Sequence, residues 1–168
     1  ATLTGTGTYG VYLNQKDNII IRNCNVLNYA SSVYLYGSNN LIQDSNFSKD
    51  GAKSGNGIYI YARSNGEESN DNNIIRIDAS NRAQGINFIG YNSGWRGSFR
   101  RNTILDSNFN NNSYGLKHDA GSRLYDFNIS NNNIFNASSY AIDLYSNNTS
   151  GASTNHTITP DNNLYGST

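Results

Sequence analysis

A short alternation of apolar and polar residues recurs along the chain. In its first copy, Val11 and Leu13 fall on one side and Tyr12 and Asn14 on the other, which is the period of two expected of a half-buried strand. The pattern returns at five further places: Ser32–Leu35, Gly57–Ile60, Gly85–Phe88, Gly115–His118 and Ala141–Leu144. The runs are short and are separated by Gly, Ser, Asn and Asp, which favour turns. We therefore predict short strands joined by tight corners.

Each copy is followed by a second apolar run and then by a polar residue with an apolar neighbour. These polar residues are Asn25, Asn46, Asp78, Asn108, Asn133 and Asn163, and their spacing varies between 21 and 32 residues. A drifting period of this length is typical of a solenoid. The sequence predicts an all-β, single-stranded, right-handed parallel β-helix of about six rungs, with residues 1–168 as one domain. The handedness follows the usual sense of parallel crossovers.

The repeated polar residue has a physical role in such a coil. An Asn amide can bond its counterpart one rung above and one rung below, so a ladder of Asn side chains satisfies polar groups at a bend. Asp78 interrupts this predicted ladder, and there its carboxylate needs a hydrogen-bond donor. The chain's 31 Asn and 21 Ser residues fit this chemistry.

Composition narrows the classes of partner. The formal net charge is zero and 14% of residues are charged, which argues against a nucleic-acid binder. No apolar run approaches the length of a membrane span. Neither end of the chain reads as a cap, so we expect it to be part of a longer protein or to stack on other copies or an adjoining domain through its end rungs.

Insertions enlarge one repeated corner, and such insertions often build the binding side of a solenoid. They cover residues 62–72, 90–101 and 146–155, with a smaller one at 119–123. The second of them carries Trp95, the only tryptophan in the chain.

The outward positions of the repeated strand form two columns of side chains. We predict that an extended sugar polymer, acidic or neutral, stacks on these aromatic rings and bonds their polar tips. The candidate binding residues are Tyr12, Tyr34, Tyr36, Tyr59, Tyr61, Trp95, Arg123 and Tyr145. The alternative is that the tyrosines only stabilise the coil by stacking between rungs.

The stretch Tyr114-Gly115-Leu116-Lys117-His118-Asp119 resembles the Tyr-Gly-Phe-Asp-Pro-His motif of mannuronan C5-epimerases, which are right-handed β-helix enzymes acting on alginate. The repeat texture is similar to the wider pectate-lyase-like β-helix superfamily over nearly all of the chain. The family's Asp falls on Lys117 and its His on Asp119, so the acid/base pair of the motif is not reproduced.

The resemblance implies removal of the proton next to a uronate carboxylate by a base. The candidate catalytic residues are Lys117, Asp119 and Asp143. In this hypothesis Lys117 is the base, Arg82 or Arg123 neutralises the carboxylate, and Tyr59 delivers a proton. The two carboxylates argue against it because they favour a charged lysine. Lys117 and Asp143 can instead be a surface ion pair, and His118 falls on the inward side, where a core residue is expected.

No His and Cys spacing indicates a metal site. Glu67, Glu68 and Asp71 offer oxygen ligands that could hold Ca²⁺, although their spacing matches no known loop motif and a solvated acidic tip explains them as well. The leading hypothesis is an extracellular or surface domain, on a cell or a virion, that engages polysaccharide; whether it also catalyses an epimerase- or lyase-like reaction is left open by the sequence. The alternative is a structural, adhesin or fibre module without catalysis.

Overall fold

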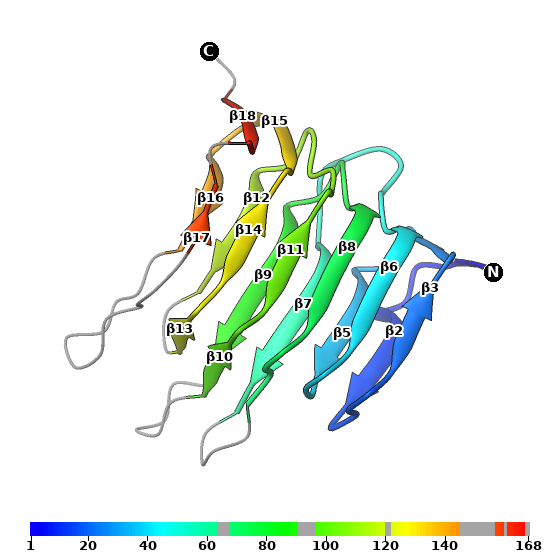
Figure 1. Cartoon of the computed structure of the whole chain (residues 1–168). Helices are drawn as coiled ribbons and strands as arrows, with labels where there is room; N and C mark the ends of the chain where they lie inside the picture. Colours follow the sequence, from blue (N-terminus) through cyan, green and yellow to red (C-terminus); the bar gives the residue numbers. More distant parts are fainter. Residues whose placement is uncertain (64–67, 91–96, 120–121, 145–156, 160, 167–168) are drawn as a thin grey trace.

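The computed structural model describes residues 1–63, 68–90, 97–119, 122–144, 157–159 and 161–166 (Figure 1). Strands joined by turns and loops make up this part of the chain, and they stack side by side into an elongated coil. No helix within these ranges is long and apolar enough to cross a membrane.

A six-stranded parallel sheet contains the repeated alternation predicted from the sequence. Its order is β16-β12-β9-β7-β5-β2. The strands are β2 (Tyr9–Asn14), β5 (Ser31–Tyr36), β7 (Asn56–Ala62), β9 (Gln84–Gly90), β12 (Tyr114–His118) and β16 (Tyr140–Asp143). Consecutive strands of this sheet are separated by a full turn of chain, so each rung contributes one strand to it. This arrangement confirms the predicted parallel solenoid.

An eight-stranded sheet forms the opposite wall of the coil, as the two sets of arrows in Figure 1 show. It contains β1 (Thr2–Thr4), β3 (Ile20–Arg22), β4 (Asn25–Leu27), β6 (Leu41–Asn46), β8 (Asn73–Asp78), β11 (Thr103–Leu105), β14 (Asn128–Ser130) and β17 (Thr157–Ile158). Two parallel pairs lie at the corners: β10 (Ser98–Arg100) with β13 (Arg123–Tyr125), and β15 (Asn133–Ala137) with β18 (Asn163–Gly166).

The core is a column of apolar side chains between the walls. Val33, Ile58, Ile86 and Leu116 pair in register along the six-stranded sheet, and all four are buried. Phe88 lies in the same interior and makes edge-on contacts with Phe99 and Phe127, with ring centroids 5.4 and 5.1 Å apart. Because each rung adds only a few side chains to this column, the modest apolar fraction of the chain is enough to fill it.

Asn and Asp side chains stack at the corners, as predicted, and in two different ways. Asn25, Asn46, Asp78, Asn108, Asn133 and Asn163 pair in register from rung to rung. In this outer column Asp78 finds its donor in the backbone N–H of Ser80, at 3.0 Å. A second stack, which the sequence analysis did not identify, is buried: the backbone N–H of Asn40 donates to Asn72 Oδ1, and that of Asn72 donates to Asn102 Oδ1, both at 3.0 Å.

Sharp bends, both between strands and within β6 and β8, rely on left-handed backbone conformations. One such column contains Asn23, Asp44, Arg76, Asp106 and Asn131, with φ between 50° and 54°. Asn and Asp tolerate this conformation better than other residues with a Cβ. The abundance of these two residues is therefore a direct consequence of the number of corners.

Small residues are required where each rung enters the six-stranded sheet. A Cβ on Gly85 would lie 2.5 Å from the backbone oxygen of Gly115, and one on Gly115 would lie 2.5 Å from that of Ala141. Close packing between rungs therefore explains why Gly recurs as the second residue of these strands, with the small residues Ser32 and Ala141 in its place in two rungs.

Candidate functional site

The strand register confirms the first predicted outward column. Tyr12 pairs with Tyr34, Tyr34 with Tyr59, and Tyr59 with Asn87. Asn87 then pairs with Lys117, and Lys117 with Asp143. In the second column Asn14 pairs with Tyr36, and Tyr61 with Ile89. The outer surface of this sheet therefore runs from an aromatic part to a charged part along the axis of the coil.

The aromatic part is a continuous cluster of rings, which we call the tyrosine face: Tyr9, Tyr12, Tyr34, Tyr36, Tyr59 and Tyr61. The ring centroids of Tyr12 and Tyr34 are 4.7 Å apart, and those of Tyr34 and Tyr59 are 5.5 Å apart. Tyr36 meets Tyr61 edge-on at 5.6 Å. Tyr9, which was not among the predicted binding residues, contacts Tyr12 at 5.3 Å.

Exposure differs strongly within the tyrosine face. Tyr34 keeps 8% of its surface exposed and Tyr36 keeps 4%, whereas Tyr12 keeps 56%. Tyr59 and Tyr61 are half-buried. Tyr34 and Tyr36 therefore act mainly as the floor of the cluster, which agrees with the stacking alternative for these two residues. Tyr12, Tyr59 and Tyr61 offer the surface on which a ligand can lie.

Burial raises the pKa of Tyr59 to about 12, with smaller contributions from Tyr9, Tyr61 and the nearby carboxylate of Asp119. Burial also raises the pKa of Tyr34, and the surrounding tyrosines add to the effect. Both phenols are therefore protonated at neutral pH, so each hydroxyl can donate a hydrogen bond.

The charged part is built around Asp119 and is here called the Asp119 cluster: Asn87, Lys117, Asp119 and Asp143. Lys117 Nζ lies 2.7 Å from Asp119 Oδ1, and Asn87 Nδ2 donates to Asp119 Oδ2 at 3.2 Å. Lys117 Nζ also lies 4.9 Å from the ring centroid of Tyr114. The predicted neighbourhood of Lys117 and Asp143 is confirmed by the register, while the ion pair that the structure shows for Lys117 is with Asp119.

Asn87 carries an unsatisfied acceptor. Its side chain is 5% exposed, and its Oδ1 atom is buried without a hydrogen-bond partner. A buried polar atom without a partner costs free energy, and such atoms concentrate where a water or ligand completes the site. The sequence analysis assigned no role to Asn87. The signal available was that it replaces the tyrosine of the preceding rungs.

The geometry bears on the hypothesis of proton abstraction. A lysine that donates to a carboxylate as an ammonium presents no lone pair to a substrate, so the ion pair with Asp119 disfavours Lys117 as a base.

The assignment of Arg82 to a substrate carboxylate is wrong. Its side chain is fully buried on the inward side of a corner and donates to main-chain oxygens of Phe47 and Tyr29. Arg123 lies on β13, the strand that follows the corner after β12, and not on the six-stranded sheet.

Other predicted residues fall in different places. Trp95 and Tyr145 lie outside the described residues. His118 is buried, as expected for its inward position, and its Nε2 is 2.6 Å from Ser122 Oγ.

The acidic residues proposed as Ca²⁺ ligands contact cations and amides. Asp71 forms a pair of hydrogen bonds with Arg101, and Glu68 contacts Arg100 at 3.7 Å and accepts from Asn70 Nδ2. Glu67 lies outside the described residues. Within the ranges described, no group of three or more His, Cys, Asp or Glu is placed to hold a metal ion.

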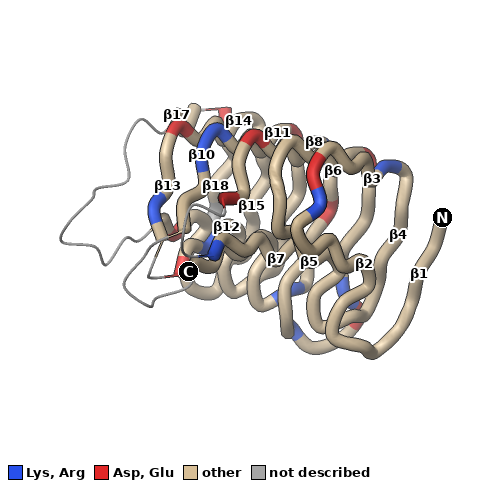
Figure 2. Tube along the Cα trace, turned by 90° about the horizontal axis from the view of Figure 1, so that it is seen from below, with Lys and Arg blue, Asp and Glu red and all other residues tan. Residues whose placement is uncertain are grey.

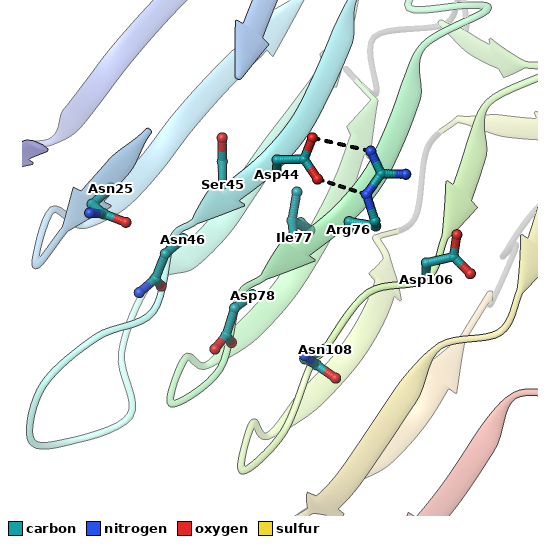
Figure 3. Close-up of a pocket in the computed structure, with 9 residues that line it drawn as sticks. All are labelled: Asn25, Asp44, Ser45, Asn46, Arg76, Ile77, Asp78, Asp106 and Asn108. Atoms are coloured by element: carbon teal, nitrogen blue, oxygen red, sulfur yellow. Dashed lines mark hydrogen bonds and ion pairs between the residues drawn. The ribbon is translucent and has the colours of Figure 1, made fainter. Parts of the chain in front are cut away.

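A shallow groove of about 410 Å³ lies on the other wall of the coil (Figure 3). Its lining residues are Asn25, Asp44, Ser45, Asn46, Arg76, Ile77, Asp78, Asp106 and Asn108. Arg76 spans to the neighbouring rung and makes hydrogen bonds of 2.7 and 3.1 Å with Asp44, drawn as dashed lines in Figure 3. Arg76 and Asp44 neutralise each other, Asp78 and Asp106 remain as carboxylates, and none of these lining residues is aromatic, so the groove is a weaker candidate than the tyrosine face.

Comparison with known proteins defines the class. A family model described as a right-handed beta helix region matches residues 2–163, which is nearly the whole chain. The chain therefore belongs to the right-handed β-helix family, and this match agrees with the predicted handedness. A search of curated proteins found no match.

Proposed function

We propose that this β-helix domain binds a polysaccharide along the tyrosine face and the Asp119 cluster. The observation that carries the proposal is the in-register column from Tyr12 to Asp143, which places exposed aromatic surface and unsatisfied polar groups on one wall of the coil. A linear polymer of repeating sugars matches a surface whose side chains repeat about every 4.8 Å.

The chemistry of the two parts suits sugars. Flat aromatic rings pack against the C–H faces of a sugar, and their hydroxyls bond its polar edge. The protonated hydroxyl of Tyr59 and the carboxylate of Asp119 provide a donor and an acceptor on the same wall of the coil. Sites of this kind combine apolar surface with a few oriented polar groups.

The proposal is one of binding. The epimerase- or lyase-like reaction stays a prediction, and the ion pair of Lys117 counts against the version of it that uses this residue as a base. In our proposal the domain acts outside the cell or on a cell or virion surface, where polysaccharides are accessible.

Affinity electrophoresis in gels containing single polysaccharides tests the proposal. Tyr12→Ala removes exposed aromatic surface without opening the core, because the ring is 56% exposed. We expect the wild type to be retarded by at least one polymer, and Tyr12→Ala to bind it about tenfold more weakly, which corresponds to about 1.4 kcal/mol.

Phe135→Ala is the matched control, since Phe135 is a 37% exposed aromatic on β15, outside the six-stranded sheet. Equal losses in the two variants would contradict the assignment of the tyrosine face. Unchanged mobility of the wild type in every gel would favour the structural module.

A further inference from the structure

Resting on the proposed function, we propose that the ligand is a chain of uncharged sugars and not a polyuronate. The inference rests on the distribution of charge over the surface that would contact the polymer. A polyuronate carries one carboxylate on each sugar, so a complementary surface needs cations that recur from rung to rung.

Cations are scarce on this wall. The strands β2, β5 and β7 contain no charged residue, and their traces are uncoloured in Figure 2. Among the outward positions that the structure describes, Lys117 is the only basic residue, and it faces two acidic ones, Asp119 and Asp143. The sum over these positions is therefore negative, which repels an anionic polymer at close range.

The single cation is already engaged. Lys117 Nζ lies 2.7 Å from Asp119 Oδ1, and its side chain is 23% exposed. A uronate that recruited Lys117 would have to displace Asp119 and leave that carboxylate beside its own. Displacing Asp119 from Lys117 would leave the Asp119 carboxylate without its partner, and an uncompensated charge at a partly buried site costs free energy.

The carboxylates that remain suit hydroxyl groups. Asp119 Oδ2 accepts one hydrogen bond, from Asn87 Nδ2, and a carboxylate has room for more than one donor. The Asn87 Oδ1 atom is buried, so Asp119 supplies the acceptor that a ligand can reach. Sugar hydroxyls donate to this carboxylate, whereas a uronate brings a second carboxylate where a donor is required.

The charged residues that line a hollow at the rim of the tyrosine face also favour an uncharged ligand. A hollow of about 220 Å³ at the end of β5 is lined by Tyr36, Gly37, Ser38, Gln15, Asp17 and Glu68. Both of its charged residues are acidic. Cations also lie near this hollow. Arg100 contacts Glu68 at 3.7 Å and lies 4.5 Å from the ring centroid of Tyr125, and the exposed Lys16, between Gln15 and Asp17, is a cation at the rim itself.

The same affinity gels test the inference when the polymers are chosen by charge. The neutral probes are mixed-linkage β-glucan and galactomannan, and the acidic probes are alginate and polygalacturonate. We expect a neutral polymer to retard the wild type, with no retardation by either acidic polymer at low ionic strength.

Removing the acidic side chains sharpens the comparison. In the double variant Asp119→Asn and Asp143→Asn, Lys117 loses its carboxylate partner and the sum of charge on the wall becomes positive. We expect this variant to gain retardation by alginate or polygalacturonate, and the gain to disappear in high salt. The control is Asp50→Asn with Asp106→Asn, two exposed positions off this wall with the same change of net charge. An equal gain in the control would overturn the local argument.

The outcomes separate the two proposals. Retardation of the wild type by an acidic polymer overturns the inference and leaves the binding function standing. Mobility unaffected by all four polymers overturns the binding function, and the inference with it.

Discussion

Arg82 Nε donates to the backbone carbonyl oxygen of Phe47 at 2.8 Å, from a side chain with no exposed surface. The guanidinium also donates to the backbone oxygens of Tyr29 and Ser48, at 2.7 and 3.1 Å, and to Ser32 Oγ. Burial lowers the pKa of Arg82 to about 10, which still leaves it charged at neutral pH. One side chain thus satisfies main-chain oxygens from two lower rungs.

Replacing Arg82 by Met should destabilise the fold. The variant keeps much of the apolar stem and leaves several buried oxygens without donors, each at about 1–3 kcal/mol. We expect the free energy of unfolding in urea to fall by about 3 kcal/mol or more. Arg22→Met, at an exposed position, is the control and should change it little. Similar midpoints for both variants would contradict the bridging role.

The buried Asn stack makes a second prediction about stability. Asn72 Nδ2 donates to the backbone oxygen of Gly37 at 3.1 Å, and Asn72 Oδ1 accepts from the backbone N–H of Asn40 at 3.0 Å. Asn72→Ala leaves both groups buried and unpaired, so we expect a loss of about 3 kcal/mol in the free energy of unfolding. The neighbouring Asn73 is exposed, and Asn73→Ala should cost far less. The idea fails if the two substitutions prove equivalent in denaturant titrations.

The tyrosine face should make stability depend on pH in alkaline solution. The pKa of Tyr59 is about 12 in the fold, and that of a tyrosine in the unfolded chain is about 10. As pH rises from about 10 to about 12, the unfolded chain loses a proton that the folded chain keeps, so unfolding is favoured. The contribution is fully present below about pH 10 and is lost above it.

Thermal melts between pH 8 and pH 11.5 measure this effect. We expect the melting temperature to fall steeply above pH 10, with the phenolate absorbance rising mainly as the protein unfolds. Tyr59→Phe removes one of the late-titrating phenols and should show a shallower decline over the same range. Identical declines in the two proteins would mean that other groups cause the effect.

At Arg76 a favourable side-chain ion pair is combined with an unfavourable backbone conformation. It pairs with Asp44 at 2.7 Å, but its φ of 50° lies in the left-handed region, where the same corner carries Asn in other rungs. Exposed ion pairs contribute little to the free energy of unfolding, and Asn tolerates the left-handed conformation better than Arg. We therefore expect Arg76→Asn to leave the melting temperature unchanged or to raise it. Two results together would show that the ion pair dominates: a clearly lower melting temperature for Arg76→Asn, and a similar fall in the melting temperature of the wild type in high salt.

The sequence by itself determined the coil and its register. The alternation of Val11, Tyr12 and Leu13 and the recurring polar residue from Asn25 to Asn163 place each strand against its counterpart, because only matching rungs bury all the apolar positions. The pairing of Tyr12 with Tyr34 and of Lys117 with Asp143 could therefore be predicted before any coordinates. The inward position of His118 follows from the same parity.

Only the tertiary structure decided how deep each side chain lies and which partner it takes. Parity gives the side of a strand, but exposure depends on neighbours a full rung away, which bury Tyr34 and leave Tyr12 open. Arg82 was predicted to be available to a ligand because its partners in the fold are backbone carbonyl oxygens. Every residue has such an oxygen, so the sequence does not show which of them an arginine will bind. Lys117 likewise had two carboxylates within reach, and side-chain geometry rather than spacing selected Asp119. Long side chains choose among nearby partners by local packing, and local packing exists only once the rungs are stacked.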